Sequence, residues 1–244
     1  MSLKPLKITF EMDGSGVYHD ANEPLHLDAL LAWALAPFHC KGDAPARDEA
    51  PIDIPLPLGR WEIGGTWGWH ASALFPDGQQ FEALHFWRKR FRQSRAELTS
   101  GTPNLQNATY REYNMPLPLL LVPRMVCWAL GDRGRVEQVL RKQVRYLGKK
   151  RAHGHGAVIA VRAEWCDEDF SMVRDGRAMR FLPLCGAARK VRPRPPYWNS
   201  HGAVPCCEIG DVYTSNTGLD RTQTRSGSRV RSEPSLGSGS GAGK

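Results

Sequence analysis

A strand pattern followed by a helix pattern near the N-terminus constrains the fold of this chain more than any other feature. Residues Lys7–Met12 alternate apolar and polar side chains, which indicates a strand with one buried face. Within Leu25–Leu35, one helical face collects the apolar residues Leu27, Leu30, Leu31, Ala34 and Leu35. The spacing therefore predicts an amphipathic helix that packs against a sheet containing the first strand.

The same two patterns return in the second half of the chain. Leu117–Ala129 has the composition of a buried strand, and Asp132 is suited to cap a helix over Arg133–Leu147. The apolar, valine-containing run Ala157–Trp165 then indicates a further strand. Trp61–Phe75 adds strands around a glycine turn. This order predicts an α+β fold, of the ferredoxin-like kind if the strands share one sheet.

The composition of the C-terminal part changes in two steps. From Arg189 the chain is rich in Pro, Arg and Gly, and some order is expected up to Tyr213. Residues 217–244 contain almost no apolar side chain, and Gly237–Lys244 has the composition of a linker or tag remnant. We therefore expect one domain over residues 1–216, followed by a disordered tail.

The chain is basic. Lys and Arg total 33 against 25 Asp and Glu, which gives a net charge of +8 and a pI near 9.4. This balance indicates a polyanionic partner, although charge alone does not separate DNA, RNA and an anionic membrane. The longest apolar run, Leu117–Val122, is interrupted by Pro118 and stopped by Pro123, so no spanning helix is predicted. We expect a soluble, cytoplasmic protein without a membrane partner.

The six cysteines lack the spacing of a disulfide framework or of a zinc site. Their distribution, with only Cys206 and Cys207 adjacent, is typical of reduced intracellular thiols. Zinc bound by His201 with these two cysteines is an alternative, but a Cys-x-x-Cys pair is missing. We predict no metal and no cofactor.

The segment Gly148–Gly156 concentrates positive charge and glycine between the second helix and the strand after it. Its backbone is expected to be held at both ends, while the glycines allow close approach to a phosphate backbone. An equally weighted alternative is a charge-matched surface turn, because cations at the end of a helix favour its dipole. The candidate RNA-binding residues are Arg145, Gly148, Lys149, Lys150, Arg151, His153, Gly154, His155 and Gly156.

This segment fits two known phosphate motifs poorly and offers a weak case for catalysis. It lacks the Gly-Lys-Ser/Thr of a Walker motif, and it ends a helix where a dinucleotide fingerprint opens one. His153 and His155, with Lys150 nearby, suggest metal-independent RNA cleavage as an alternative function. No carboxylate is placed in the sequence to orient either histidine, so binding is favoured over cleavage and no catalytic residue is assigned.

A second basic cluster lies within Phe81–Tyr113, which we interpret as an arm or hairpin projecting from the body. Basic residues interleaved with aromatic ones suit single strands, because they combine phosphate neutralisation with base stacking. The alternative is a solvated arm with its aromatic side chains turned into the core. The candidate RNA-binding residues here are Arg88, Lys89, Arg90, Phe91 and Arg92. A third cluster, Arg189–Arg194, is rich in proline and is assigned to a tail or linker.

Three segments resemble a known superfamily. Pro24–Ala34 after a short first strand, Gly148–Gly156 before a late strand, and Glu208–Tyr213 near the end are together similar to the RAMP superfamily of CRISPR proteins. Within that superfamily, the likeness is to the Cas five-type subunit of type IV effector complexes. It spans roughly Lys4 to Tyr213.

The resemblance implies a ferredoxin-like, RRM-like core with a protruding thumb, which is the arm at 81–113. It also implies a non-catalytic subunit that binds the 5′ handle of the guide RNA in a prokaryotic ribonucleoprotein complex. Implied partners are the backbone RAMP subunits, a large subunit and, through the complex, target DNA. The superfamily includes processing nucleases, but their catalytic residues have no match in this chain. A generic basic nucleic-acid-binding protein is a further alternative.

Overall fold

The centre of the fold is an antiparallel sheet whose strands come from distant parts of the chain. The computed structural model describes residues 3–18, 23–39, 50–90, 112–149, 151–183 and 189–213, all within one compact unit. The sheet order is β5-β8-β1-β9, and every neighbouring pair is antiparallel. These strands are β1 (Lys4–Met12), β5 (Phe75–Asp77), β8 (Arg124–Gly131) and β9 (Val158–Trp165).

Strand β1 confirms the alternation seen in the sequence. Leu6, Ile8 and Phe10 are fully buried, while the residues between them are only partly covered. The strand begins at Lys4, three residues before the predicted start, because its pairing with β8 runs from Lys4 to Glu11. Ile8 lies opposite Cys127 of β8 on one side, and β9 pairs on the other side. Strand β1 is therefore the inner strand on which the core is built.

Two predicted helices form, with shifted ends. Helix α1 (Leu27–His39) buries Leu27, Leu31 and Ala34, and it contacts α3 (Arg133–Gln143), which packs on β9. Asp132 caps α3 as predicted, since its carboxylate accepts the backbone N–H of Arg135 at 3.1 Å. Helix α3 ends four residues earlier than predicted because Val144 is extended. Strands and helices together confirm the α+β class.

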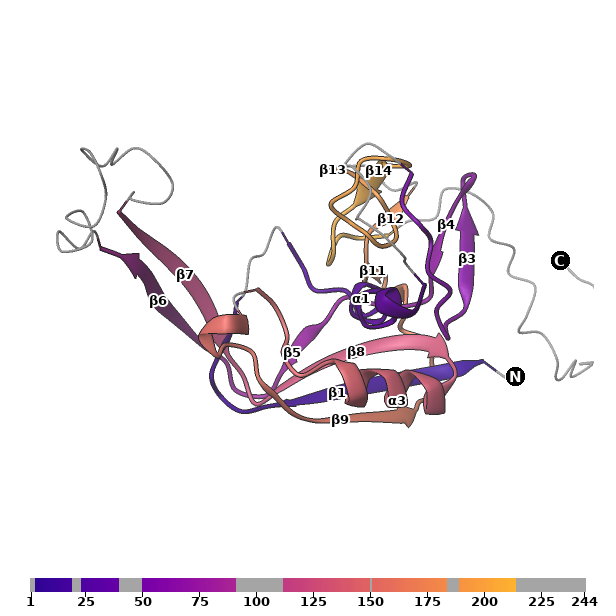
Figure 1. The fold of residues 1–244 in the computed structure, drawn as a ribbon. Coiled ribbons are helices and arrows are strands. Elements are labelled where there is room, and N and C mark those ends of the chain that lie inside the picture. Colours follow the sequence, from indigo (N-terminus) through magenta and orange to yellow (C-terminus); the bar gives the residue numbers. More distant parts are fainter. Residues whose placement is uncertain are drawn as a thin grey trace, which may run out of the picture. The chain divides into compact units, whose positions relative to one another are not determined.

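The predicted arm contains a β-hairpin. Strands β6 (Phe81–Lys89) and β7 (Tyr113–Leu121) pair from Phe81↔Leu121 to Lys89↔Tyr113, and β2 (Val17–Tyr18) pairs with β7. Most of β6 is exposed, and in Figure 1 the hairpin extends away from the four-stranded sheet. Of the predicted arm, residues 91–111 lie outside the described residues.

The prediction of one buried strand over Leu117–Ala129 is wrong. This stretch is divided between β7 of the hairpin and β8 of the central sheet, with Pro123 between them. Proline has no N–H to donate to a ladder and has a fixed φ, so it separates the two pairings.

Smaller sheets follow the central one. The strands around the Gly64-Gly65 turn are confirmed as the β3–β4 hairpin, and β12, β14 and β13 form a three-stranded sheet. Cys207 is disulfide-bonded, so the prediction of reduced thiols is wrong for this residue. The bounds are β3 (Arg60–Ile63), β4 (Thr66–Trp69), β10 (Val173–Arg174), β11 (Arg177–Ala178), β12 (Leu182–Pro183), β13 (Arg189–Val191) and β14 (Val204–Cys207). Among the described residues, no helix is long and apolar enough to cross a membrane.

A buried ion pair joins α1 to the C-terminal strands. Arg180 and Asp28 are fully buried, and their side chains meet at 3.1 Å. The Tyr197 hydroxyl donates to Asp28 at 2.9 Å. The Arg180 guanidinium also donates to backbone carbonyls of Trp69, Ala71 (2.8 Å) and Pro193 (2.6 Å). Its Nε is buried without a partner among the described residues, so the hydrogen bonds of the two terminal nitrogens compensate the burial of this charge.

The third basic cluster is folded into the protein, so its assignment to a tail or linker is wrong. Arg192 is almost completely buried and donates to Asp53 at 2.6 Å. Arg194 pairs with the same carboxylate at 3.1 Å and lies 4.2 Å from the Trp67 ring centroid. These arginines fasten the C-terminal segment to the chain around Asp53, and β13 and β14 confirm the order expected before Tyr213.

We predict that Asp28→Ala lowers the free energy of unfolding by about 3–5 kcal/mol, because it leaves the buried Arg180 guanidinium without its counter-charge. Urea denaturation followed by circular dichroism measures the loss. The matched control is Asp77→Ala, which breaks the exposed pair with Arg124 and should cost less than about 1 kcal/mol. Equal losses in the two variants would contradict the role of the buried pair.

A second prediction concerns His26, which is buried between the rings of Tyr197 and Phe181. Burial, assisted by the charge of Arg180, lowers the pKa of His26 well below its usual 6.5. The unfolded chain then binds a proton that the folded protein does not. Stability is fully present above pH 6.5 and falls below it, by up to about 1.4 kcal/mol per pH unit.

Urea titrations at several pH values compare the wild type with His26→Phe, in which this acid-induced loss should become smaller. The exposed His39→Gln is the control and should keep the full loss. An identical acid dependence in the wild type and His26→Phe would rule out His26 as its source.

Candidate nucleic-acid interface

Hydrogen bonds hold the glycine segment where it begins and where it ends, as the sequence predicts. Gly156 accepts the backbone N–H of Leu147 at 2.7 Å and donates its own N–H to Gly16 at 2.8 Å. The segment thus closes a loop on itself and is fastened to the turn between β1 and β2. Between these points runs a short 3-10 helix, η1 (Arg151–His153).

The three glycines of the segment serve different purposes. All have positive φ: 78° at Gly148, 83° at Gly154 and 74° at Gly156. A Cβ on Gly156 would overlap the carbonyl oxygen of Leu147, and one on Gly148 would lie 3.1 Å from the carbonyl oxygen of Tyr18. Nothing lies within 4 Å of a Cβ placed on Gly154. Packing therefore explains Gly148 and Gly156, and Gly154 faces open space.

The cations of the segment lie beside aromatic rings. The Arg151 guanidinium is 4.7 Å from the Trp33 ring centroid, and the Lys149 ammonium is 5.8 Å from that of Tyr18. Lys149 also pairs with Glu23, which offsets part of its charge. Lys150 lies outside the described residues. Arg151 is thus the exposed cation of the segment that stands over an exposed tryptophan, an arrangement that single-stranded nucleic acids use for stacking.

The two histidines face the hairpin. The His155 ring centroid is 5.0 Å from that of His85, and the His153 ring centroid is 5.4 Å from that of Trp87. His155 Nδ1 lies 3.0 Å from the carbonyl oxygen of Ser15, and a carbonyl accepts, so this nitrogen carries the proton. The other nitrogen, Nε2, is buried without a hydrogen-bond partner among the described residues. His155 therefore supports the contact between the two segments.

The hairpin presents its own cations and rings. Arg88 donates to the Asn114 side chain at 2.9 Å, and its guanidinium is 5.4 Å from the Phe86 ring centroid. Trp87 packs on Tyr113 at 4.7 Å. Lys89 closes the paired part of β6, and Arg90, the next residue, is exposed. Phe91 and Arg92 lie outside the described residues.

The structure thus brings the two predicted basic clusters together through aromatic contacts. The exposed aromatic side chains Trp33 and Phe86 lie beside Arg151 and Arg88 on the two sides of this contact. We use the name junction surface for the residues that flank this contact, which are Arg88, Phe86, Lys149, Arg151 and Trp33. Trp33 was missed in the sequence, although its position off the apolar face of its helix was a signal that it is exposed.

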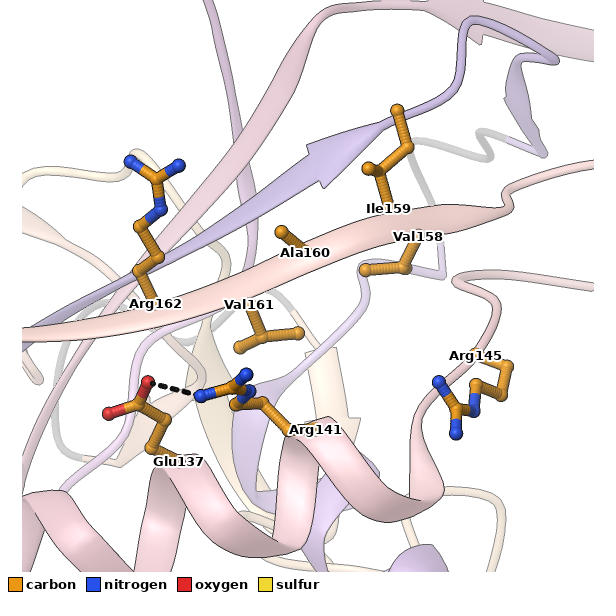
Figure 2. A pocket seen from close by; sticks show the side chains of 8 residues that line it. All are labelled: Glu137, Arg141, Arg145, Val158, Ile159, Ala160, Val161 and Arg162. Atoms are coloured by element: carbon orange, nitrogen blue, oxygen red, sulfur yellow. Dashed lines mark ion pairs between the residues drawn. The ribbon is translucent and has the colours of Figure 1, made fainter.

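Arg145 differs from the other candidates in its surroundings. It follows the end of α3 and lines a pocket with Arg141 of the same helix and Arg162 of β9 (Figure 2). Its backbone carbonyl accepts the N–H of Val158 at 3.0 Å, which fixes this residue beside the start of β9.

Comparison with known proteins identifies one family. A family model described as CRISPR type IV associated protein Csf3 matches residues 4–107 and 87–208. The two matched stretches together include both basic clusters and all the strands of the central sheet. No curated protein matches the chain.

We predict that Gly156→Ala is far more damaging than Gly154→Ala. Positive φ costs a non-glycine residue about 1–2 kcal/mol at either position, and the Gly156 variant also clashes with Leu147. The free energy of unfolding in urea should fall by about 1 kcal/mol for Gly154→Ala and by clearly more for Gly156→Ala. Similar losses would show that the packing of the segment does not need a glycine at 156.

Proposed function

Because the chain belongs to the Csf3 family of CRISPR type IV associated proteins, the Cas five-type subunits of type IV complexes, we propose that it binds the 5′ handle of the guide RNA. The observation that carries this proposal is the contact between the glycine segment and the hairpin. It sets a cation beside an exposed ring near each of the two segments, Arg151 with Trp33 and Arg88 with Phe86. Cations neutralise phosphates while exposed rings stack on splayed bases, so such a surface suits single-stranded RNA.

The topology supports a ferredoxin-like core for this subunit. The chain order β1, α1, β5, β8, α3, β9 is strand-helix-strand-strand-helix-strand, and these strands form one antiparallel sheet. The β6–β7 hairpin is inserted between β5 and β8 and is our candidate for the thumb. In this proposal the thumb and the glycine segment hold the RNA together.

The geometry around the histidines favours binding without cleavage. The Nδ1 of His155 is committed to Ser15 and its Nε2 is buried, so neither nitrogen is available to a 2′-hydroxyl. His153 packs against Trp87, and no carboxylate hydrogen-bonds to either histidine among the described residues. We therefore propose a non-catalytic role.

The proposed partners follow from this role. As a subunit at the RNA 5′ end, the protein contacts neighbouring backbone subunits and the large subunit, while the guide itself pairs with target DNA. The exposed apolar side chains of Phe81, Leu84 and Met115 on the hairpin are suited to a subunit contact.

The test is binding of a labelled, repeat-derived 5′-handle RNA. Changing Arg88, Lys149 and Arg151 together to Ala should weaken binding roughly a hundredfold at moderate salt, since each loses a charged contact with phosphate. The slope of log affinity against log salt concentration should fall by about 2, which corresponds to three phosphate contacts. The RNA recovered from these mixtures should be full length.

The matched control changes Arg135, Arg177 and Lys190 to Ala, which removes the same charge from exposed positions outside the junction surface. It should keep most of the affinity. If the two triple variants bind equally, the protein is a generic basic nucleic-acid binder and the junction surface has no special role. Shortened RNA would favour the nuclease alternative.

A further inference from the structure

A pocket lies between the end of α3 and the edge strand β9. Its volume is ≈ 320 Å³, and Figure 2 shows the side chains that surround it. Strand β9 ends the sheet order, so on this side the pocket borders no other strand among the described residues. The lining residues are Glu137, Arg141, Arg145, Val158, Ile159, Ala160, Val161 and Arg162.

The charges of this pocket are incompletely neutralised. Glu137 lies 3.6 Å from Arg141, beyond hydrogen-bond distance, and the Arg141 side chain is 66% exposed, so water screens this pair. Arg162 pairs with Glu11 of β1 at 3.0 Å. The structure shows no ion pair to the Arg145 side chain among the residues it describes. Arg145 therefore remains a free cation at the pocket, next to the weakly paired Arg141.

One wall of the pocket is apolar. It is formed by Val158 and Val161 of β9, which lie on the α3 side of the strand, while Ile159 and Ala160 point to its other side. In Figure 2 Val158 points toward α3, while the Arg141 and Arg145 side chains occupy the space between the helix and the strand. A lone inorganic anion gains nothing from such a wall. A nucleotide does, because its sugar or base covers the apolar side chains while its phosphate meets the guanidinium groups.

Stabilisation of the helix dipole does not account for this arrangement. A cation in the last turn of a helix gains about 0.3–1 kcal/mol, which explains Arg141. Arg145 lies beyond the helix end at Gln143, and Arg162 comes from a strand, so neither position is required by the helix.

We propose that this pocket holds one nucleotide of the guide RNA, with its phosphate on Arg141 and Arg145 and its sugar or base against Val158 and Val161. The proposal rests on the proposed function and extends the RNA-binding surface beyond the junction. Lys149 lies four positions after Arg145, so their Cα atoms lie within about 14 Å of each other. One short RNA can therefore reach both the pocket and the glycine segment.

The first experiment uses the RNA-free full chain and adenosine 5′-monophosphate as the probe. The nucleotide should raise the melting temperature of the wild type in a concentration-dependent manner. Arg141→Gln combined with Arg145→Gln should abolish this shift. The control, Arg133→Gln with Arg135→Gln on the exposed first turn of the same helix, should keep it. The melting temperatures without nucleotide establish that both double variants are folded.

The second experiment measures binding of the 5′-handle RNA over a range of salt concentrations. The Arg141/Arg145 variant should lower the slope of log affinity against log salt concentration by about 0.7, the value for one phosphate contact with a single strand. The Arg133/Arg135 control should leave the slope unchanged.

Three results would overturn the proposal. The first is an equal effect of the two double variants in both experiments. The second is an equal thermal shift from inorganic phosphate and from the nucleotide, because the apolar wall then has no role. The third is a larger shift from an acidic peptide such as oligo-glutamate, which would identify the pocket as a protein contact.

The junction-surface variant separates this proposal from the proposed function. The triple change at Arg88, Lys149 and Arg151 should retain the thermal shift with adenosine 5′-monophosphate, because none of these residues lines the pocket. If that triple change leaves handle affinity intact while the shift still depends on Arg141 and Arg145, the handle proposal fails and the pocket stands.

Discussion

The hydrogen-bonded burial of Arg180 is the interaction on which the arrangement of this fold depends. Its guanidinium binds Asp28 of α1, the Ala71 carbonyl after β4 and the Pro193 carbonyl after β13. A buried ion pair adds little net stability, but it strongly penalises any packing that leaves one partner alone. Arg180 therefore fixes α1, and with it Trp33 on the same helix, relative to the C-terminal strands.

Local periodicity explains which parts of the fold the sequence predicts well. Strand β1, the two helices and the cap at Asp132 follow from patterns a few residues long, and all of them form. The rest of the fold depends on contacts between residues that are far apart in the sequence. Arg192 lies in a proline-rich stretch typical of a tail, yet it is buried because of Asp53, 139 residues earlier. No local sequence pattern predicts such a distant partner.

In the candidate interface too, local sequence patterns predict some features and tertiary contacts determine the others. Composition identifies both basic clusters, but only the fold shows that His153 meets Trp87 and His155 meets His85. For the glycines, the sequence suggests a functional role where the structure shows a packing requirement. A sequence rich in glycine beside lysine and arginine suggests close approach to a ligand, whereas Gly156 is required mainly because the Leu147 carbonyl leaves no room for a side chain.

The position of these aromatic contacts has a consequence for how the protein can evolve. His85 and Trp87 touch the glycine segment from within the paired part of the hairpin, so the contact does not depend on the residues between Lys89 and Tyr113. Natural selection can therefore lengthen, shorten or rewrite that connection without breaking these contacts. The alignment of the two clusters depends instead on the few aromatic contacts made by His85 and Trp87.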